Sequence, residues 1–184
     1  DMSYEQALGM RSLSPVVGQA QLERYFGKGV SRAEFRKVRI ERMDAYIDEH
    51  GIDLKPGIRE LLDALDARGI PAAITSSSPT DLIRQHLGSL DLLHRFTAIC
   101  SGHDVPRSKP FPDIYLHGAA SLGLRPEECL ALEDSPAGIE SAFRAGCFPV
   151  IIPDLDQPTE DTLSRCFAKA DSLADIIDLL KQFS

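Results

Sequence analysis

Two adjacent carboxylates at the end of an apolar run are the residues of this chain best suited to hold a hard cation. The run 130–132 leads into Glu133 and Asp134, and a helical pattern begins at Ala137. This pattern predicts a buried strand that presents both acids at its carboxyl end, where open α/β sheets bind ligands. Neighbouring carboxylates repel each other unless a cation lies between them, and Mg²⁺ prefers such oxygen ligands. A solvated acidic turn is the alternative interpretation of the pair taken alone.

Hydroxyl groups cluster at the end of another predicted strand, over 70–75. Ser76, Ser77 and Ser78 follow this strand, and a helix is predicted over 79–87. The free N–H groups of a helix N-terminus, together with hydroxyl donors, form a site for an anion. The alternative is that Ser77 or Ser78 simply caps the helix.

A lysine stands in a proline-rich turn between the two features. Lys109 lies between Ser108 and Pro110, just before a helix predicted over 113–122. A lysine held in such a turn can neutralise phosphate oxygens or a metal-bound carboxylate. The alternative is an ordinary solvated lysine in a loop.

Strands alternate with helices from Pro56 onward, which positions these three features. The alternation predicts right-handed βαβ units and a parallel sheet. Residues 1–52, in contrast, contain only helical patterns: one over 17–26, and one that Ser31 caps and Gly51 ends. The strands expected are 70–75, 96–100, 128–134 and 148–152, and the helices 57–68, 79–87, 113–122, 137–145, 159–166 and 173–182.

The composition restricts the classes of function. The chain has 184 residues and a net charge of −8, which argues against a nucleic-acid-binding face. No apolar run approaches the roughly 20 residues that span a bilayer. The polar residues at the N-terminus do not have the pattern of a signal peptide. The four cysteines have no metal-binding spacing, so we expect reduced thiols in a cytoplasmic protein. The five histidines also lack such spacing.

The hydroxyl, lysine and acid features together resemble the haloacid dehalogenase superfamily of phosphotransferases. Ile74–Ser78 is similar to its motif two, Ser108–Asp113 to motif three and Leu132–Ile139 to motif four. The last two resemble the beta-phosphoglucomutase-like subgroup. The resemblance implies a three-layer, Rossmann-like α/β core with a parallel sheet and a helical cap lobe. Residues 1–52 correspond to the later part of the cap, and residues 53–184 to most of the core.

The resemblance also implies roles for single residues. Asp134 would be a direct Mg²⁺ ligand, and Glu133 a further ligand or the holder of a metal-bound water. Ser76 would donate to a phosphate oxygen, with Ser77 and Ser78 beside it. Lys109 would offset charge during phosphoryl transfer. The implied function is a Mg²⁺-dependent phosphatase for a small phosphorylated metabolite, such as a sugar phosphate.

Arg11 is a candidate substrate contact in the cap, and equally a surface arginine near the hinge. The resemblance gives it no assigned role beyond these two possibilities. We expect the cap, which includes Arg11, and the loop after motif two to select the substrate.

One departure from the family concerns the nucleophile. The family's first motif, Asp-x-Asp-Gly, supplies a nucleophilic aspartate and a general acid/base, and it is absent from the 184 residues. We expect it upstream of residue 1, on a central strand whose loss leaves a slot in the sheet. A phosphosugar mutase is an alternative: Ser78 fits that subgroup, but Pro79 stands where its mutases tend to carry lysine. A non-catalytic binding protein or fragment is the other alternative.

Overall fold

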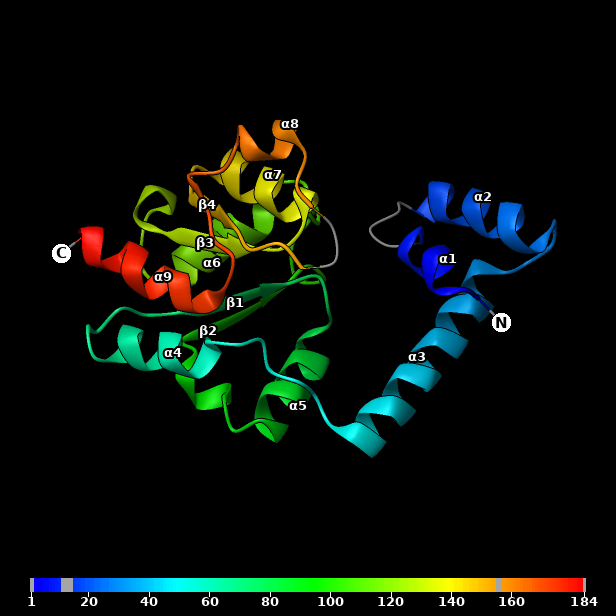
Figure 1. Cartoon of the computed structure of the whole chain (residues 1–184), viewed down its shortest axis with the longest axis horizontal. Helices are drawn as coiled ribbons and strands as arrows, with labels where there is room; N and C mark the ends of the chain where they lie inside the picture. The colour runs from blue at the N-terminus through cyan, green and yellow to red at the C-terminus, as the bar shows by residue number, and fades with distance from the viewer. Residues whose placement is uncertain (1, 11–14, 155–156, 184) are drawn as a thin grey trace. The chain divides into compact units, whose positions relative to one another are not determined.

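The computed structural model describes residues 2–10, 15–154 and 157–183, and the chain divides into two compact units, Asp1–Asp53 and Leu54–Ser184. The first unit is helical, with α1 (Tyr4–Leu8), α2 (Pro15–Phe26) and α3 (Arg32–His50) (Figure 1). The Ser31 hydroxyl caps α3 by accepting from the backbone N–H of Glu34, and Gly51 ends the helix at a positive φ of 78°. The two ends of this long helix are therefore where the sequence predicts them.

The second unit alternates helices and strands, and all its strand pairs are parallel. β1 begins at Ala73 and not at Ile70 as predicted, because Pro71 has no N–H to give to a ladder. The predicted helix over 159–166 is shorter, and the short strand β5 was not predicted. The elements are α4 (Ile58–Asp66), β1 (Ala73–Ser76), α5 (Thr80–Ser89), η1 (Leu93–Arg95), β2 (Ala98–Ser101), α6 (Asp113–Ser121), η2 (Pro126–Glu128), β3 (Leu130–Glu133), α7 (Pro136–Ala145), β4 (Phe148–Ile151), α8 (Glu160–Leu163), β5 (Ala168–Lys169), α9 (Leu173–Leu180) and η3 (Lys181–Phe183).

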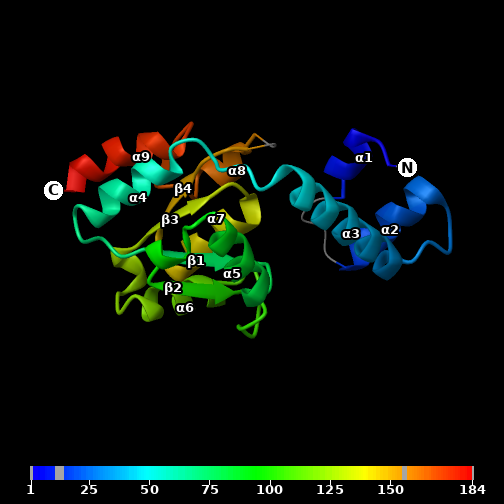
Figure 2. The same cartoon turned by 90° about the horizontal axis from the view of Figure 1, so that it is seen from below.

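Two apolar clusters on opposite faces of the strands give this unit three layers. One cluster joins α6 and α7 to the strands, and the other joins α4 and α9 to them; Figure 2 shows α4 and α9 side by side. Side chains alternate along β3, so Ala131 belongs to the first cluster, while Leu130 and Leu132 belong to the second. The same alternation sends Glu133 toward α6, where its carboxylate accepts from the Tyr115 hydroxyl.

The strands form two separate sheets, β1–β2 and β3–β4–β5. The carbonyl oxygens of Ala72 and Ser76 accept hydrogen bonds from residues on the β2 side. Backbone groups of successive residues point to alternate edges of a strand, so those of Thr75 point to the opposite edge of β1. The Glu133 carbonyl likewise bonds to the segment after β4, which leaves Leu132 at the other edge of β3. In the described ranges no ladder joins β1 to β3.

The buried Cys147 thiol gives the stability of this unit a pH dependence. Burial raises the pKa of Cys147 to about 12, whereas an unfolded thiol ionises near pH 8.5. Above that pH the unfolded chain loses a proton that the folded chain keeps, so stability present below about pH 8.5 is lost as the pH rises toward 12. The free energy of unfolding should fall by up to about 1.4 kcal/mol per pH unit from this group.

Urea unfolding between pH 8 and 11 measures this effect, with Cys147→Ala as the comparison. The variant removes the raised pKa, so its stability should decline less steeply with pH than that of the wild type. Equal slopes for the two proteins would show that this thiol does not ionise differently on unfolding.

Candidate active site

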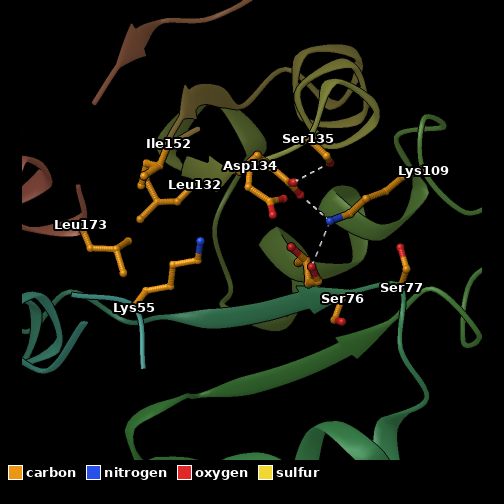
Figure 3. Close-up of a pocket in the computed structure, with 11 residues that line it drawn as sticks. Lys55, Ser76, Ser77, Lys109, Leu132, Asp134, Ser135, Ile152 and Leu173 are labelled. Carbon is orange, nitrogen blue, oxygen red and sulfur yellow. Dashed lines mark hydrogen bonds and ion pairs between the residues drawn. The ribbon is translucent and has the colours of Figure 1, made fainter. Parts of the chain in front are cut away.

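One cavity of about 410 Å³ collects the polar ends of β1 and β3 and the loop before α6 (Figure 3). Five of the predicted site residues come together in its lining: Ser76, Ser77, Lys109, Glu133 and Asp134. Ser78 does not line the cavity, and Arg11 falls outside the described residues. The complete lining is Lys55, Thr75, Ser76, Ser77, Lys109, Leu132, Glu133, Asp134, Ser135, Ile152 and Leu173.

Glu133 is buried and held by side chains from three elements. Its Oε1 accepts hydrogen bonds from the ammonium of Lys109 and from the hydroxyl of Tyr115 on α6. Its Oε2 accepts from the Ser135 hydroxyl at 3.2 Å, and Ser135 also caps α7 by accepting from the N–H of Gly138. The carboxylate therefore has a fixed position at the start of α7.

Lys109 is half-buried as a residue and its side chain is only 12% exposed, so the interpretation as a solvated loop lysine is wrong. Its Nζ donates to Glu133 and, at 3.1 Å, to the carbonyl oxygen of Thr75 at the open edge of β1. The ammonium also lies 5.2 Å from the centre of the Tyr115 ring. Lys109 thus connects β1 to β3 where no backbone ladder does.

The loop before Lys109 is fixed by a bidentate ion pair. The guanidinium of Arg107 donates to both carboxylate oxygens of Asp113, with Nε–Oδ1 and Nη2–Oδ2 distances of 3.2 and 2.9 Å. Asp113 is the first residue of α6, where a carboxylate also complements the helix dipole. The pair therefore joins the lysine loop to the helix that carries Tyr115.

The serine loop after β1 does not cap the next helix. Pro79 is the N-cap of α5 and no side chain caps it, so the capping interpretation of Ser77 and Ser78 is wrong. The Ser76 hydroxyl accepts from the N–H of Ser78 at 3.2 Å, and the buried Ser101 hydroxyl donates to the Ser78 carbonyl at 2.7 Å. Ser77 is exposed and lines the cavity. These bonds hold the Ser76 and Ser77 hydroxyls at the cavity.

Asp134 differs from its neighbour because it is exposed and lies in the cavity (Figure 3). Its carboxylate makes no hydrogen bond or ion pair with the described residues. No group of three histidine, cysteine, aspartate or glutamate side chains that could hold a metal ion occurs among them either. Mg²⁺ binds proteins through one or two carboxylates and completes its shell with waters and substrate phosphates. Asp134 and its surroundings fit such a partial donor set.

Tyr115, Ser135 and Lys55 belong to the site but were not predicted. Tyr115 follows Lys109 by six positions inside an apolar helical pattern, so periodicity places it in the core and says nothing of its hydroxyl. Ser135 could have been found as the N-cap directly after the acid pair. Lys55 lies before α4 and pairs with Asp154 at 2.7 Å, a contact between distant segments that no local pattern signals.

Gly138 is required for the position of the Glu133 carboxylate. A Cβ atom at residue 138 would lie 1.9 Å from Oε2 of Glu133. We therefore expect Gly138→Ala to displace Glu133 from Lys109 and to lower the midpoint of thermal unfolding by several degrees, as a strained buried contact does. Gly88→Ala is the matched control, because Gly88 is also helical and nothing lies within 4 Å of its added Cβ. Equal midpoints for the two variants would contradict this account of Gly138.

No helix in the described part of the chain is long and apolar enough to cross a membrane.

The family model described as haloacid dehalogenase-like hydrolase matches residues 10–152. Hexitol phosphatase A of Escherichia coli (strain K12) is 38% identical over 133 residues, which cover 70% of this chain and 60% of that protein. Hexitol phosphatase B of the same organism is 31% identical over 148 residues, covering 80% of this chain and 66% of that protein.

The chain spans about three fifths of the length of the curated relatives that it matches first. Among solved structures, the beta-phosphoglucomutase of Clostridium difficile superposes with a TM-score of 0.73 at 21% identity, covering 99% of this chain and 82% of that chain. At this identity the likeness concerns the fold. It confirms the predicted α/β class with its parallel strands and flanking helices.

Proposed function

Because the chain belongs to the haloacid dehalogenase-like hydrolases, we propose that its cavity is the phosphate and Mg²⁺ site of a phosphatase. The observation that carries this proposal is the convergence of a half-buried lysine, a pair of serine hydroxyls and a carboxylate with no partner among the described residues on the same cavity. Phosphoryl transfer depends mostly on positioning and charge stabilisation, and these groups supply both.

In this proposal each residue has a role that its position in the cavity supports. Ser76 and Ser77 donate hydroxyl hydrogen bonds to phosphate oxygens, and Lys109 neutralises charge that builds on those oxygens during transfer. Asp134 is the direct metal ligand, and Glu133 holds Lys109 and has acceptor capacity left on Oε2 for a metal-bound water. Bound Mg²⁺ would offset negative charge on the phosphate and orient it for in-line attack.

The nucleophile in this proposal is an aspartate carried by a strand between β1 and β3. Thr75 and Leu132 both line the cavity, and no strand in the described ranges pairs with the edges of β1 and β3 to which their backbone groups point. A parallel strand inserted there would pair both edges and deliver its carboxyl end beside Lys109 and Ser76. Its aspartate would attack phosphorus, form an aspartyl-phosphate and release the alcohol, and water would then hydrolyse the acyl phosphate. The Asp-x-Asp-Gly sequence upstream of residue 1 is the expected source.

The substrate class that we propose is a small phosphorylated metabolite, such as a sugar or sugar-alcohol phosphate. The similarity to two hexitol phosphatases supports this class. Four free cysteines and the acidic composition fit a cytoplasmic enzyme that does not bind nucleic acid. A mutase is less well supported, because Pro79 stands where the mutases of the subgroup tend to carry lysine.

Phosphate release from a substrate panel tests the proposal. The protein is produced with the residues that its gene encodes upstream of residue 1 and is assayed on hexitol phosphates and on beta-glucose 1-phosphate. A phosphatase releases inorganic phosphate, whereas a mutase converts beta-glucose 1-phosphate to glucose 6-phosphate without net release. No turnover of any ester by the longer protein would favour the non-catalytic alternative.

A further inference from the structure

A buried hydroxyl connects the serine loop after β1 to the end of β2. Ser101 is the last residue of β2 and has an exposed fraction of 0%. Its hydroxyl donates to the carbonyl oxygen of Ser78 at 2.7 Å and accepts from the backbone N–H of His103 at 3.0 Å. Ser101 does not line the cavity, so its effect on a ligand passes through the residues that it holds.

Ser78 is held on its other side by the hydroxyl of Ser76. The N–H of Ser78 donates to Oγ of Ser76 at 3.2 Å, which closes a turn of the kind that serine side chains form only weakly. The Ser101 hydroxyl fixes the carbonyl of the same residue from the neighbouring strand. The turn therefore depends on a buried partner outside its own loop.

The turn decides where the hydroxyl hydrogen of Ser76 points. A hydroxyl has one donor and two acceptor positions. Because Oγ of Ser76 accepts from Ser78, its hydrogen is directed away from that N–H, and this hydrogen has no acceptor among the described residues. Ser76 lines the cavity, so its hydroxyl can donate to a ligand there.

The contacts of Ser101 lie on the β2 side of β1. On the same side the Ser76 carbonyl accepts from the N–H of Gly102 at 2.7 Å, whereas the backbone groups of Thr75 point to the opposite edge. A strand inserted between β1 and β3 would therefore leave the Ser101 contacts in place.

We propose that Ser101 is a positioning residue that, through Ser78, holds the Ser76 hydroxyl in place to donate to a phosphate oxygen. Without the Ser101 hydroxyl, the Ser78 carbonyl and the His103 N–H lose their shared partner. The turn at Ser76 then opens more often, and its hydroxyl takes other orientations. The inference rests on the proposed function only where it takes phosphate as the ligand of Ser76.

Exchange of the Ser78 amide proton with water reports directly on the turn. Nitrogen-15 NMR of the 184-residue chain measures this rate in the wild type, in Ser76→Ala and in Ser101→Ala, which removes a single oxygen atom. Ser76→Ala removes the acceptor, so we expect exchange at least tenfold faster than in the wild type. In Ser101→Ala we expect it at least threefold faster. An unchanged rate in either variant overturns the proposal.

The double variant Ser76→Ala/Ser101→Ala separates positioning from a general loosening of the loop. If Ser101 acts through the turn, the turn is already absent in Ser76→Ala, and the double variant should exchange within twofold of that single variant. If removal of the Ser101 hydroxyl simply loosens the loop, the two increases should multiply. Multiplied increases would overturn the proposal.

Thr162→Val is the matched control for the loss of a buried hydroxyl. Thr162 is also buried, its hydroxyl pairs with that of Thr159 at 3.1 Å, and it does not line the cavity. The variant should retain the wild-type exchange rate of Ser78. A rate as fast as that of Ser101→Ala would mean that the loss of any buried hydroxyl loosens the loop, which contradicts a specific role of Ser101.

Titration with inorganic phosphate in the presence of MgCl₂ separates this inference from the proposed function. The wild-type amide resonances of Ser77 and Ser78 should shift on addition of phosphate, and Ser101→Ala should need at least fivefold more phosphate for the same shift. An equal requirement in both proteins overturns the proposal. If the wild-type resonances do not respond while the exchange rates change as expected, Ser101 positions the turn but the phosphate site is wrong.

Discussion

Lys109→Met should destabilise the chain by about 3–5 kcal/mol, because it leaves the Glu133 carboxylate buried without its cation. The side chains of Lys109 and Glu133 are 12% and 7% exposed, so water from the cavity that both residues line replaces the lost partner only in part. The double variant Lys109→Met/Glu133→Leu should recover most of the loss, since an apolar pair of similar volume avoids the desolvation of two charges. Urea unfolding of the single and double variants measures both effects.

The pair Lys37–Glu41 on α3 is the control for this experiment. Its side chains are 76% and 61% exposed, and exposed pairs contribute at most about 1 kcal/mol. Lys37→Met should therefore change stability little. If Lys109→Met costs no more than Lys37→Met, the Lys109–Glu133 contact is not the buried ion pair described above.

Asp134→Asn should weaken Mg²⁺ binding at least tenfold, about 1.4 kcal/mol, and leave stability nearly unchanged. The carboxylate is exposed and has no partner among the described residues, so the fold does not depend on it. An amide supplies no negative charge to a hard cation. Calorimetric titration with MgCl₂ measures the affinity, and thermal unfolding measures the stability.

Asp81→Asn is the matched control, because Asp81 is an exposed aspartate on α5 that does not line the cavity. Lys109→Ala should retain part of the Mg²⁺ affinity, since lysine balances charge and does not ligate. Equal affinities for Asp134→Asn and Asp81→Asn would exclude Asp134 as the ligand.

Local patterns in the sequence predict most of the elements that position the site. Ser31 and Gly51 predict the two ends of α3, because the cap of a helix depends on the type and backbone geometry of a single residue. The alternation of apolar runs with helical patterns gives the parallel strands, and the end of an apolar run places Glu133 and Asp134 at the end of β3. The boundaries of β1 and α8 were less accurate, since strand ends depend on which neighbour supplies the ladder.

Contacts between distant segments could not be predicted from local patterns. The burial of Glu133 follows from strand alternation, but its partners come from α6, from the loop before it and from Ser135 at the start of α7. Tyr115 looks like an ordinary core residue because its ring obeys helical periodicity. No residue of β1 or β3 predicts by itself that these two strands are unpaired; the expectation of a slot in the sheet came from the resemblance, through the motif that is absent from the 184 residues.

The hydrolysis of p-nitrophenyl phosphate tests the central claim most directly. It is measured for the 184-residue chain and for the same chain with the residues encoded upstream of residue 1, each with Mg²⁺ and with EDTA. The longer protein should hydrolyse the ester only with Mg²⁺, and the 184-residue chain should not hydrolyse it, because its nucleophile would lie on the strand between β1 and β3. Hydrolysis by the 184-residue chain that persists in EDTA would contradict both the metal site and the aspartate mechanism.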